Sequence, residues 1–359
     1  MSSVRARAAA KINLHLGVGA VRDDGYHGLC SVYQAISLYD QVTAEPWHSW
    51  RIETRTEPYV DRAAVPGVGD NIVTRAGTLL ADLHDVELRA DLVVEKAIPV
   101  AGGLAGGSAD AAATLVVLDE LWDLQTPQEE LLKLAAQLGS DVPFALLGGA
   151  GHGTGRGELV EAVPDPGQWW WVVLPQRDGL STPAVYRHFD DMVPHAGTPA
   201  SADGLIAALS TGDPRELAAC LHNDLQRPAF DLRPELRSLI TLGESEGALR
   251  GLVSGSGPTC VFLCEDESHA DTVADGLRYT AHVTALIATG PETNPRRAPS
   301  DSPSVISDRS SGRRSKAGRC RSLCRQRASS RGSPVASAAI RSSAGAGVPA
   351  WGTMSSKCR

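Results

Sequence analysis

At 359 residues the chain is long enough for two domains and a sizeable hydrophobic core. Its net charge of -8 is the sum of an acidic and a basic part that meet near residue 290. Residues 292–359 hold 14 Lys and Arg but only 3 Asp and Glu, which leaves 20 basic and 39 acidic residues before them. An acidic body lacks the basic face that nucleic-acid binding needs, no apolar run reaches the roughly 18 residues of a membrane helix, and the ten residues before Lys11 are too few for a signal peptide. We therefore expect a cytoplasmic protein that acts on small molecules, with no nucleic-acid or membrane partner.

Alternating apolar residues predict an opening strand or strand pair over residues 4–18. Lys11 and Asn13 share the face opposite the apolar one. Three further elements are expected in chain order: a turn at residues 23–27, an amphipathic helix at 71–83 and a β-branched strand at 92–96.

The stretch 99–113 is the most informative part of the sequence, because four glycines, a serine and an alanine-rich helix opening follow one another there. Glycines leave room for anionic oxygens and can turn successive N–H groups inward, and the positive end of a following helix stabilises phosphate. Ser108 is expected to cap that helix. The loop has neither the Gly-Lys-Ser/Thr end of a Walker A motif nor the dinucleotide fingerprint. The favoured interpretation is the phosphate loop of a nucleotide-dependent kinase, and the alternative is a plain turn between a strand and a helix.

Beyond this loop, helix and strand patterns alternate. A helix is expected from a cap at Thr126 to about Leu138, and the glycine-rich stretch 149–157 suits a flexible crossing between domains. The remaining elements are a buried strand at 169–174, helices at 202–209 and 214–225, a glycine turn leading into a strand at 251–263, a helix at 269–277 and a strand at 283–287. This mixture predicts an α+β protein in two layers rather than a doubly wound parallel sheet.

The acidic body contains four cysteines without metal-ligand spacing, Cys30, Cys220, Cys260 and Cys264, which we expect to be reduced. From about residue 293 the chain is rich in Ser, Arg, Pro and Gly, so a disordered basic tail is expected. Nonspecific binding of nucleic acid or acidic lipid is the alternative for that tail, and a solvated appendage is favoured. No protein-bound metal is expected.

Three separated blocks agree with one another: a lysine-bearing strand near the N-terminus, the glycine loop, and a Gly-Ser-Gly-Pro-Thr turn at residues 255–259. Together they resemble the superfamily of galactokinase, homoserine, mevalonate and phosphomevalonate kinases (GHMP kinases), and within it the family of 4-(cytidine 5′-diphospho)-2-C-methyl-D-erythritol kinases. The resemblance covers residues 4 to about 290, with motifs in the family's order: 10–14 (AKINL), 24–27 (DGYH), 106–112 (GGSADAA), 138–143 (LGSDVP), 181–183 (STP), 223–225 (NDL) and 254–259 (SGSGPT). It implies a two-domain GHMP kinase fold: a ribosomal-protein-S5-like ATP-binding and catalytic domain over 1–157, a ferredoxin-like domain over 158–291, and the disordered Arg/Ser-rich tail over 292–359.

The family's activity implies transfer of the γ-phosphate of ATP to the 2-hydroxyl of 4-(cytidine 5′-diphospho)-2-C-methyl-D-erythritol, giving the 2-phosphate and ADP in the non-mevalonate (methylerythritol phosphate) route to isoprenoids. Mg²⁺ then accompanies ATP, carried mostly by nucleotide and water, since the sequence shows no carboxylate cage. Two alternatives stay open: another GHMP kinase, acting on homoserine or a mevalonate, and a noncatalytic ligand-binding member. The DGYH element counts against the first, and the presence of both Lys11 and Asp141 counts against the second.

Two residues match the family's catalytic positions. Asp141 is expected to take the hydroxyl proton, held by an extended backbone before Pro143, and Lys11 to orient the hydroxyl and offset phosphoryl charge. From the residues alone, Asp141 is a turn or helix-end carboxylate and Lys11 an exposed strand lysine. By the resemblance, ATP is bound by Asn71, Lys96, Pro99, Gly102, Gly103, Leu104, Gly106, Gly107, Ser108 and Ala109, and the substrate by Asn13, Tyr26, His27, Tyr33, Thr182 and Tyr186, with Tyr26 and His27 at the cytosine. For Asp110, a position turned away from the triphosphate and a contact with Mg²⁺ both stay open.

Overall fold

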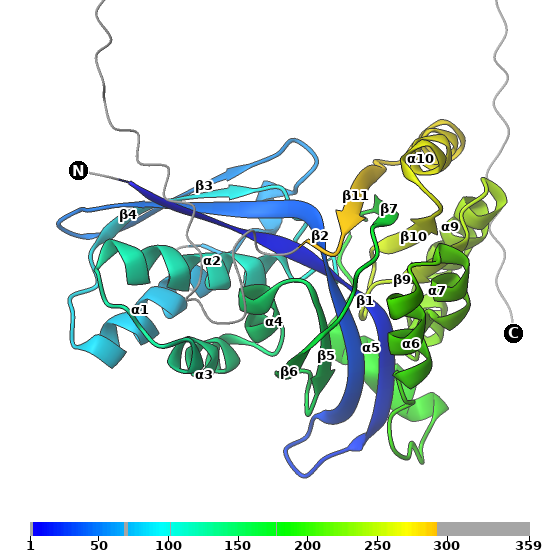
Figure 1. The fold of residues 1–359 in the computed structure, drawn as a ribbon, viewed down its shortest axis with the longest axis horizontal. Helices are drawn as coiled ribbons and strands as arrows, with labels where there is room; N and C mark the ends of the chain where they lie inside the picture. Colours follow the sequence, from blue (N-terminus) through cyan, green and yellow to red (C-terminus); the bar gives the residue numbers. More distant parts are fainter. Residues whose placement is uncertain (1–2, 68–70, 101, 177, 293–359) are drawn as a thin grey trace, which may run out of the picture. The chain divides into compact units, whose positions relative to one another are not determined.

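The computed structural model describes residues 3–67, 71–100, 102–176 and 178–292, which belong to one compact unit. Two sheets and their helices build this unit (Figure 1). The predicted α+β class is confirmed, since antiparallel pairing dominates both sheets. Of the predicted disordered tail, residues 293–359 lie outside the described residues, whereas Glu292 is held by backbone hydrogen bonds to Ala35 and Gly149, so the predicted start at 292 was one residue too early.

The first sheet has seven strands in the order β3-β4-β2-β1-β8, with β5 pairing to β2 and β6 pairing to β5. These strands are β1 (Val4–Val21), β2 (His27–Glu45), β3 (Trp50–Thr56), β4 (Ala90–Lys96), β5 (Ala150–Thr154), β6 (Leu159–Val163) and β8 (His222–Asn223). β1 and β2 form a long antiparallel hairpin around the predicted turn, and register shifts beside Ala9 and Asn13 bend it (Figure 1). The bent hairpin therefore reaches both sheets.

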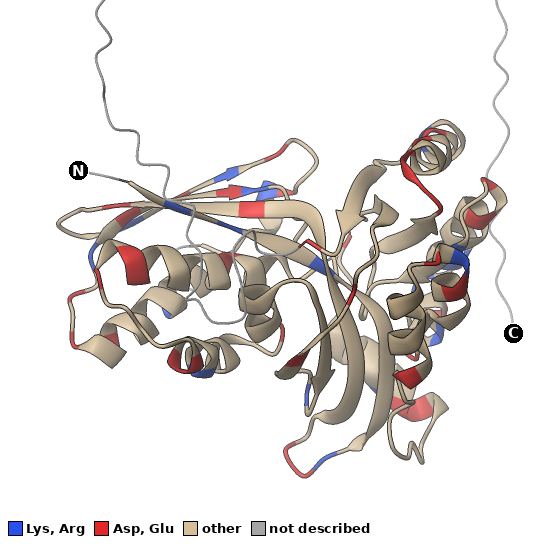
Figure 2. Ribbon diagram, viewed as in Figure 1, with Lys and Arg blue, Asp and Glu red and all other residues tan. Residues whose placement is uncertain are grey.

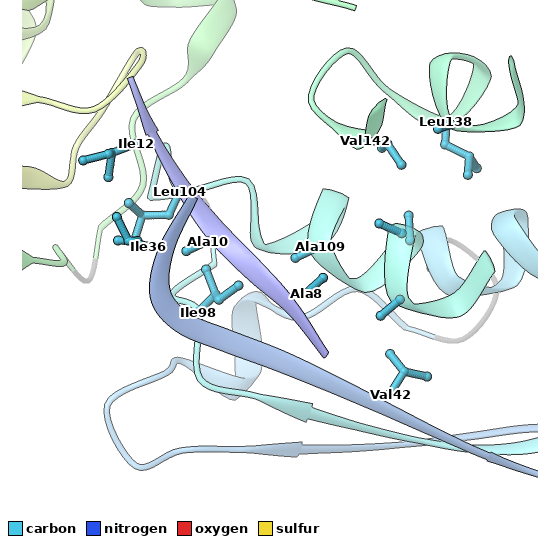
Figure 3. Close-up of a cluster of buried hydrophobic side chains, with 14 of the residues drawn as sticks. Ala8, Ala10, Ile12, Ile36, Val42, Ile98, Leu104, Ala109, Leu138 and Val142 are labelled. Carbon is cyan, nitrogen blue, oxygen red and sulfur yellow. The ribbon is translucent and has the colours of Figure 1, made fainter. Parts of the chain in front are cut away.

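Four helices cover one face of the first sheet: α1 (Ile72–His84), α2 (Gly106–Leu121), α3 (Gln128–Leu138) and α4 (Val142–Leu147). A short 3-10 helix, η1 (Arg62–Ala64), precedes α1. The Asn71 side chain begins α1 by accepting a 3.0 Å hydrogen bond from the Val73 N–H. Figure 3 shows Ala8 and Ala10 of β1 next to Ala109 of α2, and these small side chains let the buried helix lie close to the hairpin.

The glycine-rich stretch 149–157 is strand and hairpin, so the expectation of a flexible crossing there was wrong. β5 pairs with β2 and turns back into β6, and the chain crosses to the second sheet between Val163 and Trp169. The glycines serve packing, because a Cβ on Gly153 would come within 2.5 Å of the Tyr33 ring. The domain limits at 157 and 291 stay a prediction.

The second sheet has four strands in the order β11-β7-β10-β9: β7 (Trp169–Leu174), β9 (Arg250–Val253), β10 (Cys260–Cys264) and β11 (Leu286–Gly290). Its side of the molecule carries α5 (Thr182–Met192), α6 (Asp203–Thr211), α7 (Pro214–Cys220), α8 (Gln226–Leu232), α9 (Pro234–Ser245) and α10 (Glu267–Ala281). The helix predicted over 214–225 was too long, because the chain after Cys220 extends as β8 and pairs with β1. The predicted core strand is confirmed, with Trp169 and Trp171 fully buried.

Charged residues of both signs are interspersed over both layers rather than gathered on one part of the ribbon (Figure 2). In the described part of the chain no helix combines the length and the apolar composition needed to cross a membrane. All four cysteines described there are free thiols, as predicted.

Candidate active site

A cavity of about 900 Å³ is lined by the hairpin of β1 and β2, the glycine loop, the start of α4, helix α5 and the turn at 255–257. Most of the predicted site residues line it: Lys11, Asn13, Tyr26, His27, Tyr33, Asn71, Lys96, Gly102, Gly103, Gly106, Gly107, Ser108, Asp141, Thr182 and Tyr186. Three predicted ATP residues, Pro99, Leu104 and Ala109, are instead buried in the interior and are not among the lining residues described. One cavity thus gathers residues that are far apart in the sequence.

The glycine loop delivers the start of α2 to this cavity. Ala105 has a positive φ of 58°, which lets the helix begin at Gly106, three residues earlier than a Ser108 cap would allow. No side chain caps the first turn of α2, so the prediction that Ser108 is the cap was wrong. The first N–H groups of a helix without a side-chain cap are free to bind an anion, and the helix dipole favours negative charge there.

The loop also docks on the turn that follows β9. Ser254 Oγ donates a 3.1 Å hydrogen bond to the Gly103 carbonyl, and the Thr259 N–H donates one of 3.2 Å to the Gly102 carbonyl. Gly103 has φ +78°, and a Cβ there would lie 2.2 Å from the Ser254 carbonyl oxygen. Only glycine fits this contact, which joins the loop to the second sheet.

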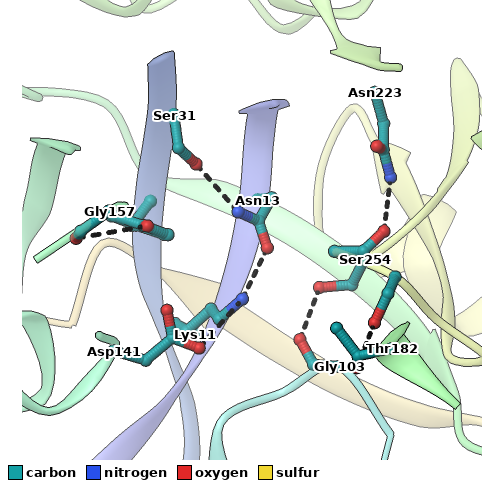
Figure 4. Close-up of polar contacts among 12 residues, drawn as sticks. Lys11, Asn13, Ser31, Gly103, Asp141, Gly157, Thr182, Asn223 and Ser254 are labelled. Atoms are coloured by element: carbon teal, nitrogen blue, oxygen red, sulfur yellow. Dashed lines mark hydrogen bonds and ion pairs between the residues drawn. The ribbon is translucent and has the colours of Figure 1, made fainter. Parts of the chain in front are cut away.

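Lys11 and Asp141 lie next to each other at the cavity wall (Figure 4). Lys11 Nζ is 3.6 Å from Asp141 Oδ2 and donates a 2.6 Å hydrogen bond to Asn13 Oδ1. Asn13 is oriented in turn by Ser31, whose Oγ accepts a 2.8 Å hydrogen bond from Asn13 Nδ2. The Lys11 side chain is 7% exposed, so the alternative of an exposed strand lysine was wrong.

Asp141 precedes α4 as its N-cap residue, yet its side chain makes no capping hydrogen bond. Its carboxylate is 32% exposed and faces the cavity instead. The backbone here is helical rather than extended, contrary to expectation, because Pro143 stands in the first turn of α4, where proline is tolerated. The rigid start of a helix therefore holds this carboxylate.

Tyr33 forms the wall beside this pair. Its ring centre lies 5.5 Å from Lys11 Nζ, and its hydroxyl donates a 3.4 Å hydrogen bond to the Gly157 carbonyl. Burial, more than the nearby charge of Asp141, raises the pKa of the Tyr33 hydroxyl well above its usual value. Tyr33 is therefore a neutral wall beside the pair.

An aromatic arm of the cavity is formed by Tyr26, His27 and Tyr186. The His27 and Tyr186 rings lie 4.9 Å apart, and His27 Nε2 is 2.7 Å from Asp190 Oδ1. Tyr26 is 55% exposed, and the Arg156 guanidinium lies 4.8 Å from its ring centre. Burial raises the pKa of the Tyr186 hydroxyl, so that ring is also neutral.

The structure answers the question about Asp110. Its carboxyl group is turned toward Lys96, whose Nζ donates to Asp110 Oδ2 at 2.6 Å and to Asp40 Oδ2 at 2.5 Å. The Lys96 ammonium is thus held by two carboxyl groups at the cavity wall.

Another predicted substrate residue, Thr182, contacts the turn after β9: its Oγ1 lies 2.8 Å from Ser256 Oγ.

Sequence reasoning missed several lining residues. Asp190, Arg156 and Arg187 line the arm, and they carry no motif that singles them out. Asn223 braces the turn after β9 by donating to the Val253 and Gly255 carbonyls at 2.7 and 2.8 Å. The NDL and SGSGPT motifs contained that signal, because an amide side chain and a glycine turn are typical of a braced loop.

Residues 71–149 match the family described as GHMP kinases N terminal domain, and residues 205–282 match GHMP kinases C terminal. A relative from Nocardioides sp. (strain ATCC BAA-499 / JS614), named 4-diphosphocytidyl-2-C-methyl-D-erythritol kinase, is 59% identical over 286 residues, which cover 79% of this chain and 96% of that protein. The chain belongs to the 4-diphosphocytidyl-2-C-methyl-D-erythritol kinase family. Another member of the family, from Thermobifida fusca (strain YX), is 49% identical over 284 residues, 77% of this chain and 92% of that protein. The resemblance inferred from the motifs is confirmed.

Solved structures agree with this membership in the kinase family. A crystal structure of 4-(cytidine 5′-diphospho)-2C-methyl-D-erythritol kinase has a TM-score of 0.66 and 32% identity, and the match covers 79% of this chain and 98% of that one. Mevalonate kinase from L. major, solved with R-mevalonate, has a TM-score of 0.62 at 17% identity over 80% of this chain and 96% of that one, which shows a common fold. The chain is an ATP-dependent small-molecule kinase of the GHMP type.

Proposed function

We propose that the enzyme transfers the γ-phosphate of ATP to the 2-hydroxyl of 4-(cytidine 5′-diphospho)-2-C-methyl-D-erythritol, in the methylerythritol phosphate pathway of isoprenoid precursors. One observation carries the proposal. The pair of buried Lys11 and partly exposed Asp141 shares a single cavity with an uncapped helix start and with an aromatic arm. The first suits proton removal from an alcohol, the second a triphosphate and the third a nucleobase.

ATP is proposed to bind along the glycine loop, with its phosphates against Gly106, Gly107 and Ser108. A Cβ on Gly107 would meet no protein atom within 4 Å, which is the open space that a close phosphate needs. Asn71, at the start of α1, and Lys96 line the same part of the cavity and are proposed to border the nucleoside.

Asp141 is proposed to accept the proton of the 2-hydroxyl as its oxygen attacks the γ-phosphorus. Lys11, held by Asn13 at 2.6 Å, is positioned to orient the hydroxyl and to offset charge on the phosphoryl oxygens. The bond from the γ-phosphorus to the β,γ-bridging oxygen breaks, and ADP leaves. Tyr33, which is buried and neutral, forms the cavity wall beside this pair.

Mg²⁺ accompanies ATP in phosphoryl transfer. The residues described contain no group of three or more His, Cys, Asp and Glu side chains that could hold a metal, and Asp110 is bound to Lys96. These residues do not form a metal site. We propose that Mg²⁺ is held by oxygens of the nucleotide and by water, and no step above depends on a protein-bound ion.

The aromatic arm is proposed to hold the cytidine diphosphate. Tyr26, His27 and Tyr186 offer ring faces and a ring nitrogen to the base, while Arg156 and Arg187 line the same arm and suit the anionic diphosphate. Thr182 and Asn13 are assigned polar contacts to the rest of the substrate. Homoserine and mevalonate have neither a base nor a diphosphate for these groups.

A coupled assay of ADP release tests the proposal. The purified chain should turn over ATP with the cytidine diphosphate substrate, and far less with homoserine or mevalonate; efficient phosphorylation of either one would reverse the assignment. Asp141→Asn should lower kcat by about 10²–10⁴-fold while ATP binding measured by calorimetry is kept. Asp191→Asn, at an exposed neighbour of the arm, is the matched control and should behave like the unmodified chain.

A further inference from the structure

Three charged side chains meet in the interior behind the glycine loop: Asp40 of β2, Lys96 of β4 and Asp110 of α2. Their side chains are 0%, 4% and 8% exposed. Lys96 Nζ lies 2.5 Å from Asp40 Oδ2 and 2.6 Å from Asp110 Oδ2. The titratable groups that face Asp110 are Lys96 from β4 and Asp40 from β2. Two carboxyl groups therefore share one ammonium, and if both were ionised the cluster would carry one negative charge.

Asp40 has the surroundings of an ionised carboxylate. Besides Lys96, it accepts hydrogen bonds from the backbone N–H groups of Ala97 and Ile98, at 2.7 and 2.8 Å, on its Oδ1. Three donors on a buried carboxylate stabilise its charged form. The two backbone bonds also fix the chain directly before the glycine loop, so Asp40 holds one end of that loop.

Asp110 has different surroundings. Its Oδ2 accepts from Lys96, but its Oδ1 is buried and has no hydrogen-bond partner among the residues described. An ionised carboxylate with one oxygen desolvated and unpaired is unfavourable, and a proton on that oxygen removes the charge. Burial, opposed by Lys96 and aided by Asp40, raises the pKa of Asp110 well above its usual value. Burial by itself would lower the pKa of Lys96, but the two carboxyl groups outweigh it and raise that pKa.

We propose that this cluster positions the phosphate loop through an unequal division of charge, in which Asp40 is the ionised partner of Lys96 and Asp110 is protonated. The cluster then holds both ends of the loop, at residues 97–98 and at 110, and presents no net negative charge to the triphosphate. This proposal rests on the proposed binding of ATP at the loop. Asp40 and Asp110 are positioning residues, because they act through Lys96 and the loop.

Two isosteric variants separate the two carboxyl groups. Asn at 110 keeps the shape of a neutral acid, with an oxygen for Lys96 and an amide in place of the O–H, so Asp110→Asn should change the KM for ATP and the melting temperature far less than Asp40→Asn does. Asp40→Asn must turn its amide toward either Lys96 or the backbone N–H groups, and the lost charge-assisted bonds should raise the KM for ATP by about 10–100-fold. The KM for the second substrate should not change. Asp91→Asn is the control, because Asp91 lies on β4, the strand of Lys96, but pairs with Arg51 of β3.

Infrared spectroscopy measures the proton directly. At about pH 8 ordinary carboxyl groups are ionised, so the enzyme should show one carboxylic C=O band that Asp110→Asn removes. The absence of that band, or a rise in the KM for ATP with Asp110→Asn as large as with Asp40→Asn, would overturn the proposal. If Asp40→Asn fails to fold, the band still decides. A chain that shows the band but binds no ATP would support the division of charge and refute the proposed function instead.

Discussion

Gly107→Ala tests whether this glycine is required by bound ATP rather than by packing within the protein. A Cβ on Gly102 would lie 2.7 Å from Thr259 Oγ1 and one on Gly103 2.2 Å from the Ser254 carbonyl oxygen, so protein packing alone opposes a side chain at these two glycines. One on Gly106 would lie 3.0 Å from Ile98, which would have to shift by a few tenths of an ångström. Gly107 lies in the first turn of α2 at an ordinary helical φ, and a Cβ there would meet nothing within 4 Å.

The expected effects on stability and on catalysis have opposite signs. Alanine in a helix is more favourable than glycine by about 0.5–1 kcal/mol, so the free energy of unfolding should rise by that amount and the melting temperature by roughly 1–2 °C. The same methyl group projects into the space assigned to a phosphate. Overpacking of about 1–3 kcal/mol corresponds to a rise of about 5–150-fold in the KM for ATP. The KM for the cytidine diphosphate substrate should stay constant.

The assays are thermal melting without ligands and ADP release at varied ATP. Gly103→Ala is the contrasting variant, because alanine at φ +78° is strained by about 1–2 kcal/mol before its contact with a backbone oxygen is counted, and its melting temperature should fall. A stabilised Gly107→Ala enzyme with an unchanged KM for ATP would refute the position of the phosphates and with it the reason for this glycine.

Three other predictions concern stability. The hydrogen bond that His222 Nε2 donates to Asp224 Oδ1 raises the pKa of His222, so the charged ring contributes stability that is complete below about pH 6.5 and is lost as the pH rises through the raised value; the melting-temperature difference between the enzyme and His222→Asn should therefore shrink from about pH 6 to about pH 9. A chain that ends at Glu292 should melt like the full chain and keep its activity, whereas one that ends a residue earlier should melt at a lower temperature. The Glu292 N–H donates a hydrogen bond to the Ala35 carbonyl of β2, and the Glu292 carbonyl accepts one from the Gly149 N–H, just before β5. Gly243→Ala should cost about 1–3 kcal/mol of unfolding free energy in urea denaturation, since its Cβ would lie 2.2 Å from the Phe262 ring; a loss below the error of the fit would contradict that contact.

Local pattern was enough to predict much of this enzyme. The run of glycines before an alanine-rich helix identified the phosphate loop, since chain flexibility and helix dipoles are properties of neighbouring residues. Asn71 before an amphipathic stretch marked the start of α1 for the same reason. Where local pattern failed, the reason lay in partners distant along the chain. Gly153 and Gly157 make room for Tyr33 of β2, and the chain after Cys220 leaves its helix to pair with β1.

By itself, then, the sequence determined the kinase family and the α+β class and predicted the phosphate loop, because these depend on short motifs and on periodicity. Only the tertiary structure decided which charges meet. Lys11 lies 3.6 Å from Asp141, 130 positions further along the chain, and Lys96 is shared by Asp40 and Asp110 from two other elements. Strand register and burial select such partners among many Asp residues, and neither is written in the residues next to them.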